Sequence, residues 1–118
     1  MQNFRNVKAW QKGHLLTLEV YRITQGFPAE ERYGLTSQIR RAASSIGANI
    51  AEGCGRGSDA DFRRLLHYAL GSVNEVEYYL LLSSDLSFLR SAEHARLEAL
   101  VIEVKKMLTA LVLKLKSA

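Results

Sequence analysis

The C-terminal part of the chain reads SAEHARLEALVIEVKKMLTALVLKLK over residues 91–116, and this stretch decides the fold. Its large apolar side chains recur every three or four residues, which places them on one face of an α-helix. The members of this heptad-type stripe are Leu97, Leu100, Val101, Val104, Leu108, Leu111 and Leu115. Ser91 is the N-cap candidate, so the pattern predicts a helix over residues 92–116.

The two segments before this stripe have the same helical period. A helix is predicted over residues 59–84, with Ser58 as its N-cap and Asp61 as the capping-box partner. Its inner face consists of Phe62, Leu65, Leu66, Ala69, Val73, Val76 and Leu80. Another helix is predicted over residues 36–54, with a face rich in small residues: Ile39, Ala42, Ala43, Ile46 and Ile50. Gly47 costs this helix about 1 kcal/mol relative to alanine, so we expect a packing reason for it.

The first helix is predicted over residues 7–25, because Gly26 and the dipeptide Phe27-Pro28 end the pattern. Apolar residues make up 47% of the 118, which is enough for a hydrophobic core. Four helices with short connections and no strand alternation predict an all-α, up-down four-helix bundle. Residues 1–118 are expected to form one domain.

The composition also narrows the class of protein. Cys54 is the only cysteine, which excludes an intrachain disulfide and a multi-cysteine zinc site. The N-terminus lacks the apolar core of a signal peptide, and no apolar run approaches the roughly 20 residues that cross a bilayer. We therefore expect a cytoplasmic protein that has no membrane partner.

Patterns of catalytic and metal-binding residues are missing from the sequence. There is no Glu-x-x-His pair, no His-Glu-x-x-His motif and no Walker-type phosphate loop, and the histidines are isolated. The glycine-rich residues 53–57 could hold a phosphate, but Asp59 and Asp61 already complement the next helix N-terminus. We favour an interhelix turn there, and expect no enzyme activity, metal or cofactor.

The first helix has two apolar groups on nearly opposite sides, and one bundle core does not easily cover both. One group is Ala9, Leu16, Val20 and Ile23, and the other is Val7, Trp10, His14, Leu18 and Tyr21. Either Trp10 and Tyr21 lie on the surface or another subunit covers them, and we favour the subunit. Further interface candidates are Gln38, Arg41, Ser45, Asn49 and Glu52 on the second helix and Glu75 and Tyr78 on the third, for which a solvated face stays an alternative.

A net charge of +4, from 16 Lys and Arg against 12 Asp and Glu, permits binding of a polyanion. The candidate contacts are Arg40, Arg41, Arg56, Arg63, Arg64, Lys105, Lys106, Lys114 and Lys116. They would contact phosphates without reading bases, because few exposed aromatic platforms are expected. The alternative is that these side chains only make the domain soluble.

Several stretches resemble the family of 23S rRNA intervening-sequence proteins. They are Trp10-Gln11-Lys12, Phe27-Pro28, Tyr33-Gly34-Leu35, Gln38-Ile39-Arg40-Arg41-Ala42, Ser45-Ile46, Asn49-Ile50-Ala51-Glu52-Gly53, Arg56, and Gly71-Ser72 with Glu75. The resemblance covers nearly the whole chain. Gly47 stands where many members carry proline.

This resemblance implies a four-helix bundle of bacterial type that assembles as a ring-like homopentamer and associates with RNA. A related branch, the accessory proteins of diversity-generating retroelements, implies a reverse transcriptase or DNA as further partners. The family has no established catalytic residues, and Arg40, Arg41, Asn49, Glu52 and Arg56 are structural or interface residues in one interpretation. Two hypotheses follow: an oligomeric nucleic-acid adaptor, and a protein-interaction scaffold without a nucleic-acid role.

Overall fold

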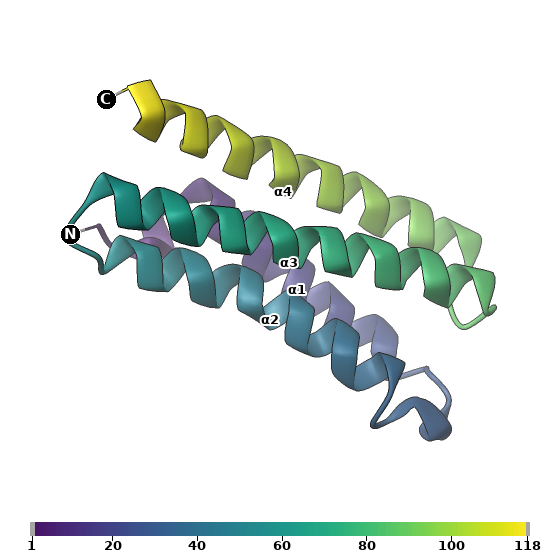
Figure 1. The fold of residues 1–118 in the computed structure, drawn as a ribbon. Coiled ribbons are helices and arrows are strands. Elements are labelled where there is room, and N and C mark those ends of the chain that lie inside the picture. Colours follow the sequence, from purple (N-terminus) through teal and green to yellow (C-terminus); the bar gives the residue numbers. More distant parts are fainter. Residues whose placement is uncertain (1, 118) are drawn as a thin grey trace.

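The computed structural model describes residues 2–117 and contains helices and no strand within that range. The long helices are α1 (Lys8–Thr24), α2 (Leu35–Cys54), α3 (Asp59–Asp85) and α4 (Ser91–Ser117). Short 3₁₀ turns, η1 (Phe4–Asn6) and η2 (Ala29–Glu31), precede α1 and α2. Consecutive helices run antiparallel in a body of 45 × 24 × 19 Å (Figure 1). The predicted all-α four-helix architecture is confirmed.

Among residues 2–117, the backbone of each long helix lies close to those of its two neighbours in the bundle and not to that of the helix on the diagonal. The contacting pairs are α1 with α2, α2 with α3, α3 with α4, and α1 with α4. Within the described chain, α2 and α4 do not meet, and Figure 1 shows them on opposite sides of α3. A side chain on the outer face of α2 therefore cannot join one on the outer face of α4 in a single site of the monomer.

The core consists of the apolar faces that the sequence predicts. Every predicted face residue of α2 and α3 is buried, and Leu97, Val101, Val104 and Leu108 of α4 are fully inaccessible to solvent. Leu100, Leu111 and Leu115 are only half-buried, whereas Val112, which was not predicted, is buried. The heptad assignment is therefore correct near the middle of α4 and one position off toward its end.

The seam between α1 and α2 depends on small residues. A Cβ atom on Gly13 would lie 2.9 Å from Cγ2 of Ile46, so α1 can approach α2 only because Gly13 has no side chain. The Thr17 hydroxyl lies 2.8 Å from the carbonyl oxygen of Ala43, which it can reach as a donor across the seam. A Cβ on Gly47 would lie 3.0 Å from Trp10 Nε1, so Gly47 has the packing reason we expected.

The helix ends confirm one predicted cap and correct another. Ser58 Oγ accepts a hydrogen bond of 3.2 Å from the backbone N–H of Asp61, as predicted for the start of α3. Ser91 is not an N-cap, because it already lies inside α4 and the carbonyl of Arg90 accepts from His94 N–H at 2.9 Å. The N-terminus of α2 is satisfied by Glu31, whose carboxylate accepts from Leu35 N–H at 3.0 Å.

A network of four charges joins α1 to α4. Glu19 accepts from Nε of Arg22 at 2.8 Å, and Glu93 accepts from Arg22 at 3.0 Å and from Arg96 at 2.8 Å. Arg96 also donates to Glu19, which closes the network. The hydrogen bond from Arg22 lowers the pKa of Glu19, and that from Arg96 lowers the pKa of Glu93.

Acid should weaken this connection. A carboxyl whose pKa is lowered by folding stabilises the fold above its unfolded pKa, and that contribution is lost as the pH falls through the folded value. Between pH 7 and about pH 3 the parent should lose more free energy of unfolding than the Glu19→Gln/Glu93→Gln variant. Urea unfolding at each pH measures this, with Glu30→Gln, an exposed residue of η2, as the control. Equal pH dependence of the parent and the double variant would contradict the role of the network.

Candidate functional site

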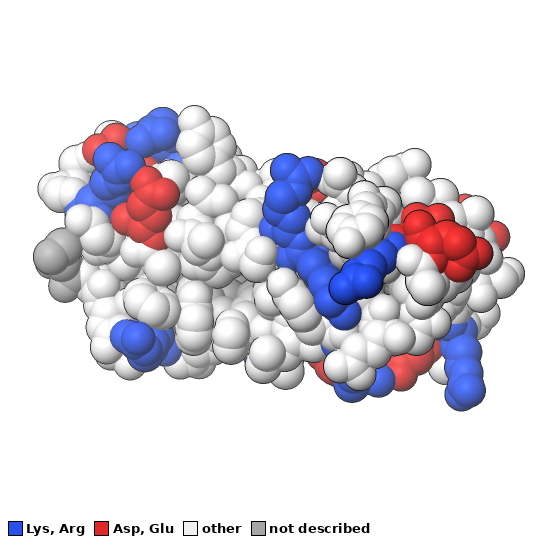
Figure 2. Space-filling view, turned by 90° about the horizontal axis from the view of Figure 1, so that it is seen from below, with Lys and Arg blue, Asp and Glu red and all other residues white. Residues whose placement is uncertain are grey.

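The groove between α1 and α2 is an uncovered surface of the bundle. It has a volume of about 350 Å³ and is lined by Trp10, His14, Thr17, Tyr21, Ser44, Gly47, Ala48 and Ala51. Figure 2 views the bundle from the side opposite α4 and shows a broad uncharged band between charged groups toward its two ends. We call this surface the α1–α2 groove.

The second apolar group of α1 lies mostly outside the core. His14, Leu18 and Tyr21 are exposed and Trp10 is half-buried, so the bundle alone does not cover them. Val7 is an exception, because it is 7% exposed and belongs to the core. The His14 ring stacks on Trp10 at a centroid distance of 4.7 Å and an interplanar angle of 8°. These side chains form an ordered aromatic surface.

The polar interface candidates on α2 contact one another or α3 within the chain. Gln38 accepts from Arg41 at 2.5 Å, and the Asn49 amide donates to the Ser45 carbonyl at 2.8 Å. The hydroxyls of Ser45 and Ser72 lie 2.5 Å apart, which joins α2 to α3. The Ser45 side chain therefore helps to hold the bundle together. The polar side chains of α2 named here already have hydrogen-bond partners within the chain.

The candidates on α3 and the end of α2 occupy other surfaces. Glu52 pairs with Arg56 at 2.5 Å. Glu75 and Tyr78 are exposed on α3, and Tyr78 packs against Tyr79 at 5.7 Å between ring centroids. Glu75 and Tyr78 therefore mark a second exposed face, on α3, which is separate from the α1–α2 groove.

The structure separates the predicted basic contacts into several places. Arg56, Arg64 and Lys105 are engaged with carboxylates of the same chain: Glu52 at 2.5 Å, Asp61 at 3.6 Å and Glu77 at 2.8 Å. Arg63 is half-buried on α3. Lys106, Lys114 and Lys116 are exposed on α4. These residues do not converge on one surface of the monomer.

Arg40 and Arg41 do lie together, in a depression that also contains residues the sequence analysis missed. The depression has a volume of about 520 Å³ and is lined by Tyr21, Arg32, Tyr33, Thr36, Ser37, Arg40, Arg41 and Ser44. Figure 2 shows basic side chains gathered in one half of the face that it views, with acidic side chains beyond them. We call this surface the arginine–tyrosine depression.

The expectation of few exposed aromatic platforms is wrong. Tyr33 is 87% exposed, and Tyr68 and Tyr78 are also exposed by more than half. In the sequence, Arg32-Tyr33 stands eight residues before Arg40-Arg41, and the turn of η2 brings the two pairs to one end of α2. The eight-residue spacing of these two pairs around the start of α2 is the feature of the sequence from which the depression could have been predicted.

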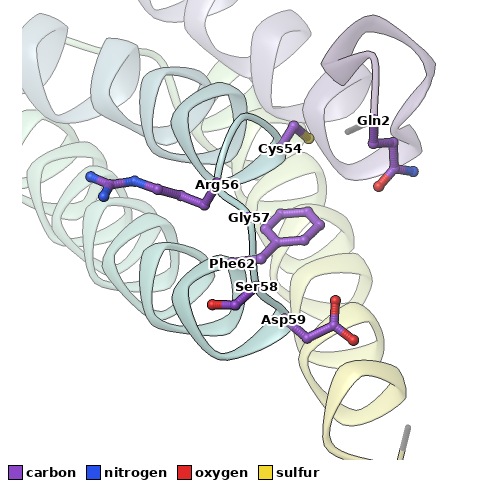
Figure 3. A pocket seen from close by; sticks show the side chains of 8 residues that line it. Gln2, Cys54, Arg56, Gly57, Ser58, Asp59 and Phe62 are labelled. Carbon is purple, nitrogen blue, oxygen red and sulfur yellow. The ribbon is translucent and has the colours of Figure 1, made fainter.

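The glycine-rich turn between α2 and α3 forms a pocket of about 260 Å³ (Figure 3). Both Arg56 and Asp59 line this pocket, but the Arg56 guanidinium points away from Gln2, Cys54 and Phe62. An anion there would face the Asp59 carboxylate, and the Arg56 guanidinium is already paired with Glu52. Burial raises the pKa of the Cys54 thiol, which disfavours the reactive thiolate. The interpretation of residues 53–57 as a turn is the better one.

No group of three or more His, Cys, Asp or Glu side chains in residues 2–117 could hold a metal ion. No described helix is both long and apolar enough to cross a bilayer.

Comparisons with known proteins agree with the helical architecture. Residues 5–110 match the model of the family described as 23S rRNA-intervening sequence protein. A solved structure from Bacteroides thetaiotaomicron VPI-5482, described as a protein with unknown function from the S23 ribosomal protein family, is 26% identical and superposes with a TM-score of 0.80. The match covers 88% of this chain and 94% of the other. The search of curated proteins found no match.

Proposed function

Because the chain belongs to the family of 23S rRNA-intervening sequence proteins, we propose that it is a non-enzymatic, homopentameric bundle that binds nucleic acid in the cytoplasm. The observation that carries this proposal is the α1–α2 groove, whose aromatic side chains the bundle leaves uncovered. The groove shares Tyr21 and Ser44 with the arginine–tyrosine depression, so an uncharged surface and a basic one adjoin.

The chemistry of the groove suits self-assembly. Aromatic side chains that lie against small residues give large contact areas at low entropic cost, and such residues dominate the binding energy of many interfaces. A closed ring joins two different faces of each subunit. The exposed α3 face around Glu75 and Tyr78 is the natural second face for the groove of a neighbouring subunit.

Assembly would strengthen binding to a polyanion. A single chain of net charge +4 offers only a weak electrostatic attraction. Five copies in a ring present the same basic surface repeatedly, so that later contacts with one RNA become intramolecular. The expected binding is sensitive to salt and tolerant of sequence.

Light scattering after size exclusion tests assembly. The parent should elute with the mass of a pentamer, and Ala48→Glu should yield smaller species because it places a charge in the groove. Ala48 is exposed in the single bundle, so the variant should keep its helical circular dichroism. Ala60→Glu, at an exposed site in the first turn of α3, is the matched control and should remain pentameric. A parent that elutes as a monomer would overturn the assembly.

Repeating the measurement with a short RNA at low and high salt tests the second part of the proposal. A mass shift that appears only at low salt is expected. A pentamer whose mass does not change when RNA is added would favour a second candidate function. This is a scaffold that binds another protein such as a reverse transcriptase. The intramolecular pairing of Arg56, Arg64 and Lys105 with carboxylates is the observation that favours this alternative.

A further inference from the structure

The geometry points to the arginine–tyrosine depression as a site for single-stranded RNA. We propose that a base stacks on Tyr33 while Arg32 and Arg41 contact the adjoining phosphates and Arg40 adds positive charge beside them. This inference rests on the proposed function and adds the contact surface and the strandedness of the ligand.

The charge of the depression is not neutralised within the chain. Three arginines line it and no acidic residue does. None of the ion pairs found among residues 2–117 involves Arg32, Arg40 or Arg41. Glu31, which precedes Arg32, accepts a hydrogen bond from the backbone N–H of Leu35 at the start of α2. The positive potential of the three arginines is therefore available to an anion.

Two of the three arginines make side-chain hydrogen bonds within the chain before any ligand arrives. Arg40 Nε donates to the Thr24 hydroxyl at 2.8 Å, and its guanidinium lies 4.7 Å from the centre of the Tyr21 ring. Arg41 donates to the Gln38 side chain at 2.5 Å. Side chains with fixed positions lose little entropy on binding, which favours affinity. Arg40 is half-buried, whereas Arg32 and Arg41 are exposed and can contact phosphates.

Tyr33 gives the depression a flat apolar platform. Its side chain is 87% exposed, and the Arg32 guanidinium lies 5.7 Å from the ring centre. Exposed aromatic rings in a basic groove are the usual means by which proteins bind single strands without reading their sequence. An acidic peptide would use the arginines but would leave the Tyr33 ring without a stacking partner.

A duplex fits this surface less well than a single strand. The bases of a duplex are stacked on one another, so none is free to lie on Tyr33. A single strand can turn one base onto the ring and keep its neighbouring phosphates near the arginines. We therefore expect tighter binding of a single strand than of a duplex with the same sequence.

Fluorescence anisotropy with a labelled single-stranded RNA of about twelve nucleotides tests the proposal. Tyr33→Ala should weaken binding roughly tenfold. Arg32→Gln/Arg41→Gln should weaken binding and lower the slope of log affinity against log salt by about 1.4, from two lost phosphate contacts. The matched controls are Tyr68→Ala, an exposed tyrosine on α3, and Arg5→Gln/Lys8→Gln, which removes two exposed positive charges outside the depression. Both should bind nearly as the parent does.

The outcomes separate this inference from the proposed function. If the parent binds RNA and the Tyr33 and arginine variants bind equally well, the site is wrong while nucleic-acid binding stands. Equal affinity for duplex and single strand would overturn the stacking of a base. A pentamer that binds no RNA at low salt would overturn both the site and the proposed binding of RNA. Tighter binding of polyglutamate than of RNA would overturn the site, because polyglutamate has no base to stack on Tyr33. Circular dichroism of each variant confirms that the fold is kept.

Discussion

Leu108→Ala should lower the free energy of unfolding by about 2–5 kcal/mol, because it opens a cavity in the centre of the bundle. The Leu108 side chain is inaccessible to solvent and belongs to the face of α4 that packs in the core. Urea denaturation at a fixed protein concentration measures the change, since assembly contributes to the apparent stability.

Leu113→Ala is the matched control for this change. It removes the same atoms from the same helix, but Leu113 is 59% exposed. Its expected effect is within about 0.5 kcal/mol. Similar losses at the two positions would mean that the Leu113 side chain is buried in solution, for example by another subunit.

Gly13→Leu should destabilise the chain by about 3 kcal/mol. Even a Cβ at this position would lie 2.9 Å from Cγ2 of the buried Ile46, and leucine adds three more carbon atoms to the seam. The steric cost of overpacking exceeds the roughly 0.8 kcal/mol that leucine gains over glycine in helix propensity. Thermal and urea unfolding should both show the loss.

The same substitution at Gly71 should raise the free energy of unfolding instead of lowering it. Gly71 is exposed in the interior of α3, and no atom lies within 4 Å of a Cβ built there. Gly71→Leu should therefore stabilise the single bundle by roughly 0.5–1 kcal/mol, measured at a protein concentration at which the chain is monomeric. If Gly13→Leu is as stable as Gly71→Leu, then α1 and α2 are not in close contact at this seam.

The sequence alone was sufficient to predict the helices and most of the core. The apolar period located all four helices to within one residue at each end, because Gly26, the glycines of residues 53–57 and Ser58 mark clear interruptions. Ser91 failed as a cap because the hydrogen-bond pattern that starts α4 begins one residue earlier, at Arg90. Local sequence does not determine such a choice, which depends on how the preceding loop packs.

The candidate site was less predictable, because charges in a sequence do not indicate which of them meet. Arg56 and Lys105 appear free in the sequence but pair with Glu52 and Glu77. Arg32 and Tyr33 were missed because they belong to no helix period. The uncovered apolar face of α1 could be predicted from the sequence. This helix has apolar groups on nearly opposite sides, and a single core covers only one of them.

The contact pattern among the helices also has a consequence for folding kinetics. Among the long helices of the described chain, three of the four contacts join helices that follow one another in sequence, and only that of α1 with α4 joins distant helices. Bundles dominated by such local contacts fold within roughly microseconds to milliseconds, since little loop entropy is lost before contacts form. The first three helices can assemble in sequence, and docking of α4 against α1 closes the longest loop. The slowest step is therefore expected to involve this last contact, where Glu19, Arg22, Glu93 and Arg96 meet.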